Sequence, residues 1–228
     1  MDHINDEGYE IKENIFQRYG VYVSYPTIVS KSNNKKVDVW NNIILQDIGS
    51  ILKIYSDYTL NQTPKGEDLY LPDTLRITYD IKSNDNRYLS ISYKADFFSP
   101  YAAYPTQMIY TTNIDKDNDR RLKLSDFISN QRFQLNDTNL WEIVSSYDDI
   151  KDYPEAVREY IKGLGKEILH MGVMSADLIG ADNYLGIYSY LTPDRLGISI
   201  SVPHYLGDHA EYEMTIPLSL ISHLKDIQ

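Results

Sequence analysis

The sequence predicts an α+β fold: antiparallel sheets with helices packed on one face, arranged as two sequential α/β halves. The first observation is an alternation of apolar and polar residues over several short segments, clearest over 196–202 and 210–216, which is the period of half-buried strands. The second is a change to spacings of three and four over residues 35–57, which is typical of an amphipathic helix. The third is that the second half again combines expected helical segments with expected strands.

Turn-forming residues separate the expected elements. Pro26 is expected to end the first strand, and the polar run 61–73 is expected to be a loop. Pro154 suits the first turn of a second helix. The expected order is a strand at 21–25, the helix at 35–57, strands at 75–81, 89–97 and 106–114, helical turns at 124–128 and 140–147, a helix from 154, strands at 185–192, 196–202 and 210–216, and a last helical turn at 218–224.

Composition limits the classes of partner. The chain has 228 residues, a formal net charge of −11 and no cysteine. This charge argues against nucleic acid and anionic lipid and favours a cationic partner. Without cysteine there is no disulfide, thiolate metal site or cysteine nucleophile. No apolar run approaches the roughly 20 residues of a membrane span, and Met1–Glu7 is polar and acidic, unlike an export signal.

Tyrosine is the unusual component, with 21 residues against 5 Phe. Its apolar body and polar rim suit half-buried strands and also wet binding surfaces. The segment Phe97–Pro105 holds several aromatic residues and prolines between two expected strands, so it either caps the core or presents a binding surface. As binding anchors we select Phe98, Tyr101 and Tyr104, with Tyr205 as a lesser candidate.

No residue pattern identifies a catalytic centre, a metal or a cofactor. The chain lacks a nucleophile elbow, a phosphate-binding loop and a dinucleotide fingerprint. Any acidic chain offers paired carboxylates, so a carbohydrate-active hydrolase stays open. Asp115, Asp117 and Asp119 follow the spacing of a calcium loop, but an acidic hairpin turn explains the same residues. His204 and His209 match no common zinc spacing and are expected to be surface turn residues.

Seven segments taken together suggest a family: Ser24-Tyr25-Pro26, the long helix, Leu89–Tyr93, Ala102–Pro105, Tyr110–Asp115, Leu122–Ile128 and the hairpin 190–217. In order and spacing they resemble the paired extracytoplasmic domains of the lysozyme-sensing anti-sigma-V factor and of PdaC-type peptidoglycan deacetylases, where they precede the catalytic domain. The resemblance covers about residues 20–225. It departs from the family at Tyr104, where histidine is common, and in the turn 118–120 and at Arg195, where glycine is common.

Residues 1–19 are polar and are expected to be a lead-in. The resemblance implies a deacetylase-associated domain over 20–118 and an anti-sigma-V-like C-terminal domain over 119–228, packed as one globule. It also implies a non-catalytic binding or sensor module outside the cytoplasmic membrane, secreted or tethered. Its expected partner is a cationic protein such as lysozyme, or a cell-wall component such as peptidoglycan. The alternatives are a hydrolase with paired carboxylates and a structural envelope domain.

Overall fold

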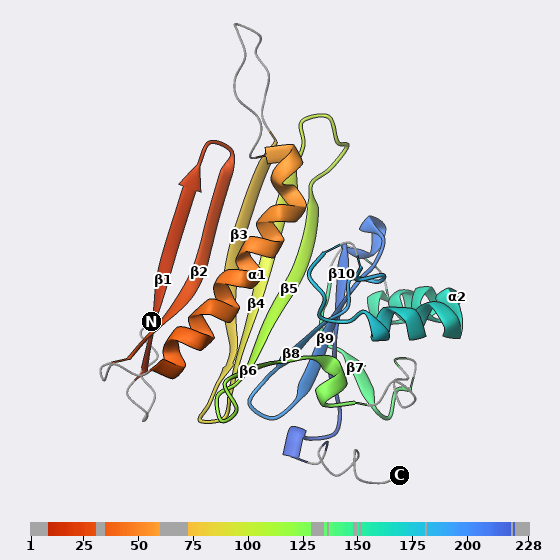
Figure 1. The fold of residues 1–228 in the computed structure, drawn as a ribbon. Coiled ribbons are helices and arrows are strands. Elements are labelled where there is room, and N and C mark those ends of the chain that lie inside the picture. The colour runs from red at the N-terminus through yellow and green to blue at the C-terminus, as the bar shows by residue number, and fades with distance from the viewer. Residues whose placement is uncertain are drawn as a thin grey trace, which may run out of the picture.

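The computed structural model describes residues 9–30, 35–59, 73–128, 135, 137–147, 150, 152–180, 182–219 and 221. The described elements form two sheets, each with one long helix (Figure 1). In chain order they are β1 (Tyr9–Arg18), β2 (Val21–Ser30), α1 (Lys35–Thr59), β3 (Thr74–Asn84), β4 (Tyr88–Phe98), β5 (Thr106–Asp115), β6 (Arg120–Leu122), the 3-10 helix η1 (Leu124–Asp126), β7 (Trp141–Ile143), α2 (Tyr153–Met174), β8 (Tyr188–Leu191), β9 (Leu196–Ser201), the 3-10 helix η3 (His204–Leu206) and β10 (His209–Met214).

The first sheet has the strand order β1-β2-β3-β4-β5-β6. Its neighbouring strands are antiparallel except for β2 and β3, which pair in parallel over Val21–Val23. The chain passes through α1 between these two strands, and a crossover of this kind returns the chain in the same direction. The alternate residues Ile91, Tyr93 and Ala95 of β4 are buried under α1, in one core with Trp40 and Ile44 of the helix.

The second sheet has the order β7-β10-β9-β8 and is antiparallel throughout. Ile198 and Ile200 of β9 lie in a second core with Val157 and Ile161 of α2. Opposite these residues, Gly197 leaves room for Tyr190, because an added Cβ would lie 2.2 Å from that ring. This sheet therefore buries one face against α2, and on its other face the small residues of β9 leave room for larger side chains from β8 and β10.

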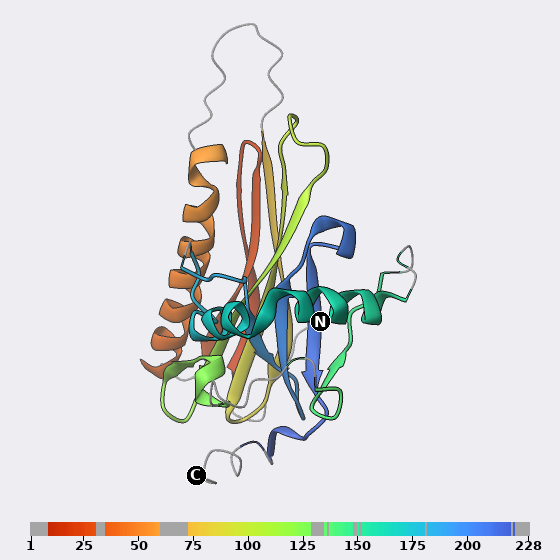
Figure 2. The same cartoon turned by 90° about the vertical axis from the view of Figure 1, so that its right-hand side faces the viewer.

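α1 runs along the first sheet, the second sheet lies beside the first, and α2 runs across the direction of the strands (Figures 1 and 2). Between the sheets the contacts are mostly polar. Leu191 N–H donates to Ser90 Oγ at 2.9 Å, and Asn113 Nδ2 donates to the Ser189 carbonyl at 2.8 Å. Lys82 lies 5.2 Å from the Tyr190 ring centroid. Hydrogen bonds thus help to join the sheets, and Tyr188 of β8 adds an apolar contact because it belongs to the core of the first sheet.

The predicted α+β class is confirmed, and so are the long helix, the meander and the closing hairpin. The expected boundary at 118/119 falls in the turn before β6, which still pairs with β5 in the first sheet. The division into two domains stays a prediction. Within the described parts of the chain, no helix is long and apolar enough to cross a membrane.

The expectation for residues 1–19 was wrong from Tyr9 onward, because β1 pairs with β2 along its whole length. Edge strands tolerate charged residues, so a polar sequence does not exclude one. Pro26 does not end β2 but pairs with Glu13. Two residues later, the N–H and carbonyl of Ile28 bond to the Asn41 side chain, each at 2.8 Å. The backbone nitrogen of Pro26 points the same way as that of Ile28, away from β1. The missing N–H of Pro26 therefore removes no hydrogen bond between β1 and β2.

The helical turn expected at 140–147 was also wrong. Trp141 is buried and pairs with Met214, so this stretch forms β7 at the edge of the second sheet. A short apolar run of this kind fits strand and helix equally well, and pairing with β10 decides the outcome. The helical turn expected at 218–224 lies largely outside the described residues, as does most of the loop expected at 61–73.

Candidate functional site

The loop 99–105 and η3 meet at one end of the molecule, although they are far apart in the sequence. The rings of Tyr104 and His204 are stacked, with centroids 3.6 Å apart and planes 2° from parallel. His204 Nδ1 lies 3.0 Å from the Asp208 carboxylate, which also accepts the backbone N–H of Gln107 at 3.0 Å. The Asp208 carboxylate therefore links η3 to the start of β5, and the ring stack links η3 to the loop.

The turn after η3 is held by its backbone conformation and by a tyrosine. Gly207 and Asp208 have positive φ angles of 90° and 69°. Tyr147 packs so close that a Cβ on Gly207 would lie 2.3 Å from its ring, and its hydroxyl donates to the Gly207 carbonyl at 2.7 Å. Burial raises the pKa of Tyr147 to about 12, so the hydroxyl keeps its proton at neutral pH. This turn gives η3 a fixed support.

The four anchors selected from the sequence are all exposed at this end. The exposed fractions are 41% for Phe98, 72% for Tyr101, 50% for Tyr104 and 70% for Tyr205. Their neighbour Phe97 turns the other way and packs on Tyr55, with ring centroids 5.5 Å apart. The loop therefore caps the core through Phe97 and presents rings to solvent through the rest. We call Phe98, Tyr101, Tyr104 and Tyr205 the aromatic face.

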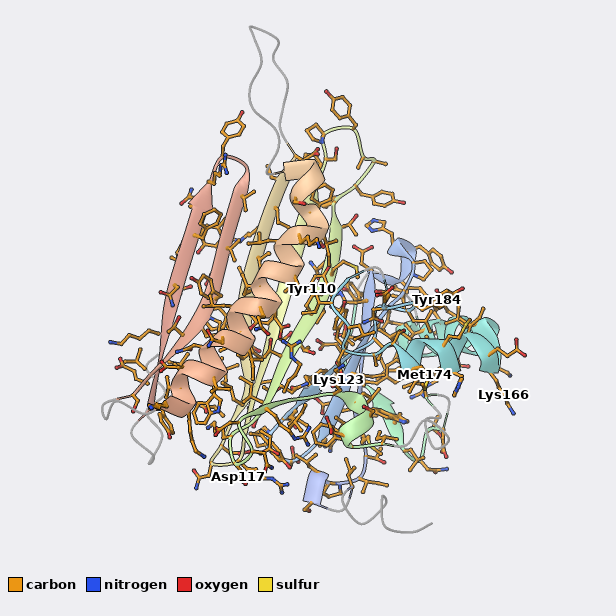
Figure 3. All side chains as sticks on the ribbon, viewed as in Figure 1. Tyr110, Asp117, Lys123, Lys166, Met174 and Tyr184 are labelled. Carbon is orange, nitrogen blue, oxygen red and sulfur yellow. The ribbon has the colours of Figure 1, made fainter. Side chains whose placement is uncertain are left out.

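Beside the aromatic face lies an aromatic cleft of about 830 Å³. Segments from α1, the loop-side ends of β4 and β5, α2 and the residues before β8 enclose it. Figure 3 shows two of its lining residues, Tyr110 on β5 and Tyr184 near the end of α2. No Asp, Glu, Lys, Arg or His is among the described residues that line it. The six rings that line it belong to Tyr55, Phe97, Tyr110, Tyr160, Tyr184 and Tyr188.

The floor of the aromatic cleft is a pair of tyrosines. The hydroxyls of Tyr55 and Tyr110 lie 3.0 Å apart and form a buried hydrogen bond. Tyr188 packs edge-on against Tyr110, with ring centroids 5.1 Å apart. Burial raises the pKa of all three phenols, so the cleft stays neutral around neutral pH.

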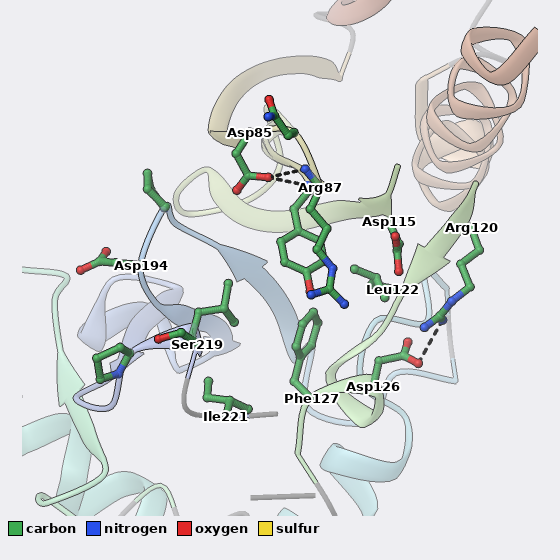
Figure 4. Close-up of a pocket in the computed structure, with 15 residues that line it drawn as sticks. Asp85, Arg87, Asp115, Arg120, Leu122, Asp126, Phe127, Asp194, Ser219 and Ile221 are labelled. Atoms are coloured by element: carbon green, nitrogen blue, oxygen red, sulfur yellow. Dashed lines mark hydrogen bonds and ion pairs between the residues drawn. The ribbon is translucent and has the colours of Figure 1, made fainter. Parts of the chain in front are cut away.

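A second cleft of about 1100 Å³ lies at the other end of the molecule, and its lining includes Asp85, Asp115, Asp126 and Asp194 (Figure 4). These carboxylates serve the local backbone and side chains. Asp85 accepts two backbone N–H groups, at 2.8 and 2.6 Å, and Asp126 accepts the Lys123 N–H at 2.8 Å and Arg120 at 3.0 Å.

The acidic turn at 115–119 does not gather its carboxylates. Asp115 accepts the N–H groups of Asp117 and Asn118, at 3.1 and 3.2 Å. Asp119 instead accepts the indole N–H of Trp40 at 2.9 Å. Across the described chain, no three His, Asp or Glu side chains form a group that could hold a metal ion. The hairpin-turn interpretation of these residues is the one that the geometry supports.

His209 is not the surface turn residue expected from the sequence. It is only 9% exposed, and burial lowers the pKa of its imidazole. Its Nδ1 has no hydrogen-bond partner among the described atoms. The sequence also gave no indication that Tyr160 and Tyr184 line a cleft with Tyr55. The high tyrosine content was the one available signal, and it does not say which rings converge.

The comparisons with known proteins show no family for this chain, and they find distant similarity to two solved structures. No protein-family model matches it, and no curated protein does. One is a solved structure of a DUF3298 family member from Bacteroides fragilis, with 16% sequence identity to this chain. The match covers 94% of this chain and 92% of that protein's chain, and the TM-score is 0.46. The other is a DUF3298 family protein from Pseudomonas aeruginosa, with 12% sequence identity to this chain. The match covers 96% of this chain and 94% of that protein's chain, and the TM-score is 0.43. Likeness at this level carries no argument about activity, and the resemblance to the anti-sigma-V and PdaC-type domains stays a prediction.

Proposed function

We propose that this chain is a non-catalytic binding module that works outside the cytoplasmic membrane and recognises a basic, lysozyme-like protein through the aromatic face. The observation that carries the proposal is the stack of Tyr104 on His204. It places two anchors selected from separate segments, Tyr104 and Tyr205, on adjoining parts of one surface. Exposed tyrosines on a fixed support are typical of the anchors of protein interfaces.

Charge supports a basic partner. The chain carries a formal net charge of −11. Long-range attraction of this kind raises the association rate of a cationic protein and weakens with salt. The rings then supply the contact area that holds the complex, since charges at a rim contribute mainly to the association rate. Binding should therefore depend on both salt and the rings.

The test is isothermal titration calorimetry with hen egg-white lysozyme at low and high salt. We expect binding at low salt that weakens as salt is added. Tyr104→Ala should weaken it by about 1–3 kcal/mol, the range for an interface anchor. Because Tyr104→Ala also removes the stack on His204, Tyr101→Ala is measured beside it.

The matched control is Tyr19→Ala, which removes a ring that is 58% exposed in the turn between β1 and β2. It should leave the affinity unchanged. Absence of binding at low salt rejects the lysozyme proposal and favours a structural domain. Equal losses for Tyr101→Ala and Tyr19→Ala would contradict docking that is centred on the aromatic face.

A further inference from the structure

We propose that the aromatic cleft is a binding site for a neutral oligosaccharide, which it holds without cleaving. This goes beyond the proposed docking of a protein, because it assigns a second ligand of different chemistry to a neighbouring surface. The volume of about 830 Å³ lies within the usual range of roughly 300–1,000 Å³ for ligand sites. Tyr184, 60% exposed, stands at its rim, so the cleft is accessible from solvent.

The lining determines the charge of the ligand. Charged residues make up 24% of the chain, yet none is among the described residues that line this cleft. An ionic ligand would lose its hydration here and meet no opposite charge, which is costly. The raised pKa values of Tyr55, Tyr110 and Tyr188 keep the floor uncharged as well. The ligand that fits this lining is neutral.

The lining also determines the kind of neutral ligand. Aromatic rings offer flat apolar faces, and the tyrosines among them add a hydroxyl at the edge. The hydroxyls of Thr106 and Ser201 lie at the same cleft. The amide of Asn183 also lines it but is held by the N–H and carbonyl of Ile187, each at 3.0 Å. A sugar ring has a matching character, with an apolar face of C–H groups and a rim of hydroxyls. A purely apolar ligand would offer the two hydroxyls no hydrogen-bond partner.

The site binds and does not hydrolyse. Cleavage of a glycosidic bond uses two carboxyl groups about 5–10 Å apart on either side of the bond. No Asp or Glu is among the described residues that line the cleft. The carboxylates of the second cleft belong to the β3–β4 turn, the end of β5, η1 and the β8–β9 turn, and these segments lie at the other end of the molecule (Figure 1). A bound sugar therefore has no acid or base beside it in the described chain.

Met108 makes the proposal testable in the intact chain. It lines the aromatic cleft, whereas Met214 is buried in the other core. We would label the methionine methyl groups with ¹³C and titrate with chitotetraose and, separately, cellotetraose. The expected result is a saturable shift of the Met108 methyl resonance with at least one sugar, and none at Met214. An oligogalacturonate of the same length is the charged comparison and should not bind.

Two variants test the contacts. Tyr184→Ala removes an exposed ring but keeps the backbone N–H of residue 184, which bonds to Ser175 Oγ. We therefore expect the fold to persist and the sugar affinity to fall about tenfold or more. Tyr160→Phe keeps the ring and removes only the hydroxyl, and a fall of a few fold is expected. Tyr19→Ala should bind sugar as the unaltered chain does, and circular dichroism confirms that each variant is folded.

The outcomes separate the two proposals. If Tyr101→Ala weakens lysozyme binding and Tyr184→Ala weakens sugar binding, each without the other effect, both stand. Absence of a Met108 shift with both neutral sugars up to about 10 mM overturns the sugar proposal and leaves protein docking untouched. Binding that is as tight for the oligogalacturonate, or that is unchanged in folded Tyr184→Ala, overturns it too.

Discussion

Asp177 shows how one buried carboxylate can join separate parts of the chain. Its backbone has a positive φ of 63°, and the residue is only 6% exposed. Its oxygens accept the N–H of Leu124 at 2.5 Å, the N–H of Ser189 at 2.6 Å and the hydroxyl of Ser189 at 2.8 Å. The start of η1 and the strand β8 are thus tied to the turn after α2. Nothing in the sequence around Asp177 indicated this role, since its partners are distant.

Burial raises the pKa of Asp177 to about 6, against about 4 in an unfolded chain. Between these values the folded state binds more protons than the unfolded state, so this group's contribution to stability is full below about pH 4 and is lost as pH rises through 6. The contribution is on the order of 2–3 kcal/mol.

We expect Asp177→Asn to remove this pH dependence. In the variant, the amide NH₂ takes the place of one carboxylate oxygen and faces an N–H or O–H donor with which it cannot form a hydrogen bond. The free energy of unfolding should therefore also fall by about 1–3 kcal/mol. Urea unfolding at pH 4.5, 5.5 and 6.5 provides the measurement. The stability difference between the parent chain and Asp177→Asn should narrow as pH rises. A difference that is constant across these pH values would show that Asp177 does not titrate in this range.

At the scale of elements, the sequence predicted a helix or strand correctly where one hydrophobic pattern extended over most of the element. The long amphipathic helix and the alternation over β4 and β9 were predicted close to their bounds. The failures include β1 and β7, whose own residues carry no decisive pattern. β1 is a polar edge strand held by β2, and β7 is three residues long and is held by β10. In both cases a distant partner decides the structure, and propensity does not reveal it.

The attachment of α1 to the first sheet also depends on partners far apart. Asp47 of α1 is 2% exposed and pairs with Arg121 of β6 at 2.5 Å, while Thr112 of β5 donates to it at 2.6 Å. Burial raises the pKa of Asp47, and the Arg121 charge acts against that shift. Without Arg121, the carboxylate would be buried with no opposite charge.

We therefore expect Arg121→Ala to destabilise the fold by about 3–5 kcal/mol. Its neighbour Arg120 is the matched control: it pairs with Asp126 at 3.0 Å on the surface, so Arg120→Ala should cost less than about 1 kcal/mol. Adding Asp47→Asn to Arg121→Ala should restore part of the loss, because the unpaired charge is gone. Urea unfolding measures all four chains, and similar losses for the two arginines would contradict this account.

At the scale of the whole molecule, the candidate site is assembled by the packing of layers. The sequence singled out Phe98, Tyr101 and Tyr104 of the aromatic face as candidates because they share a segment rich in proline and aromatics. It did not reveal that His204 would stack on Tyr104, or that α2 would bring Tyr160 to a cleft shared with Tyr55. Those contacts arise because the second sheet lies across the first, which depends on interactions between the halves of the chain.

The polar contacts between the sheets predict how the molecule unfolds. Leu191 N–H donates to Ser90 Oγ, Ser90 donates to Asn113 Oδ1 at 2.7 Å, and Asn113 Nδ2 donates to the Ser189 carbonyl. All of these side chains are buried. Unpaired groups of this kind are costly, so neither sheet should persist without the other.

Calorimetric unfolding should accordingly show one transition for both sheets, with the calorimetric and van't Hoff enthalpies in agreement. Asn113→Ala leaves the Ser90 hydroxyl and the Ser189 carbonyl without their partner, and we expect a loss of about 2–4 kcal/mol and a Tm lower by about 5–15 °C. The transition should remain single, because the loss applies to a contact that both sheets need. Two resolved transitions, in the parent chain or in Asn113→Ala, would show that each sheet with its helix folds alone and that the polar layer merely holds them together.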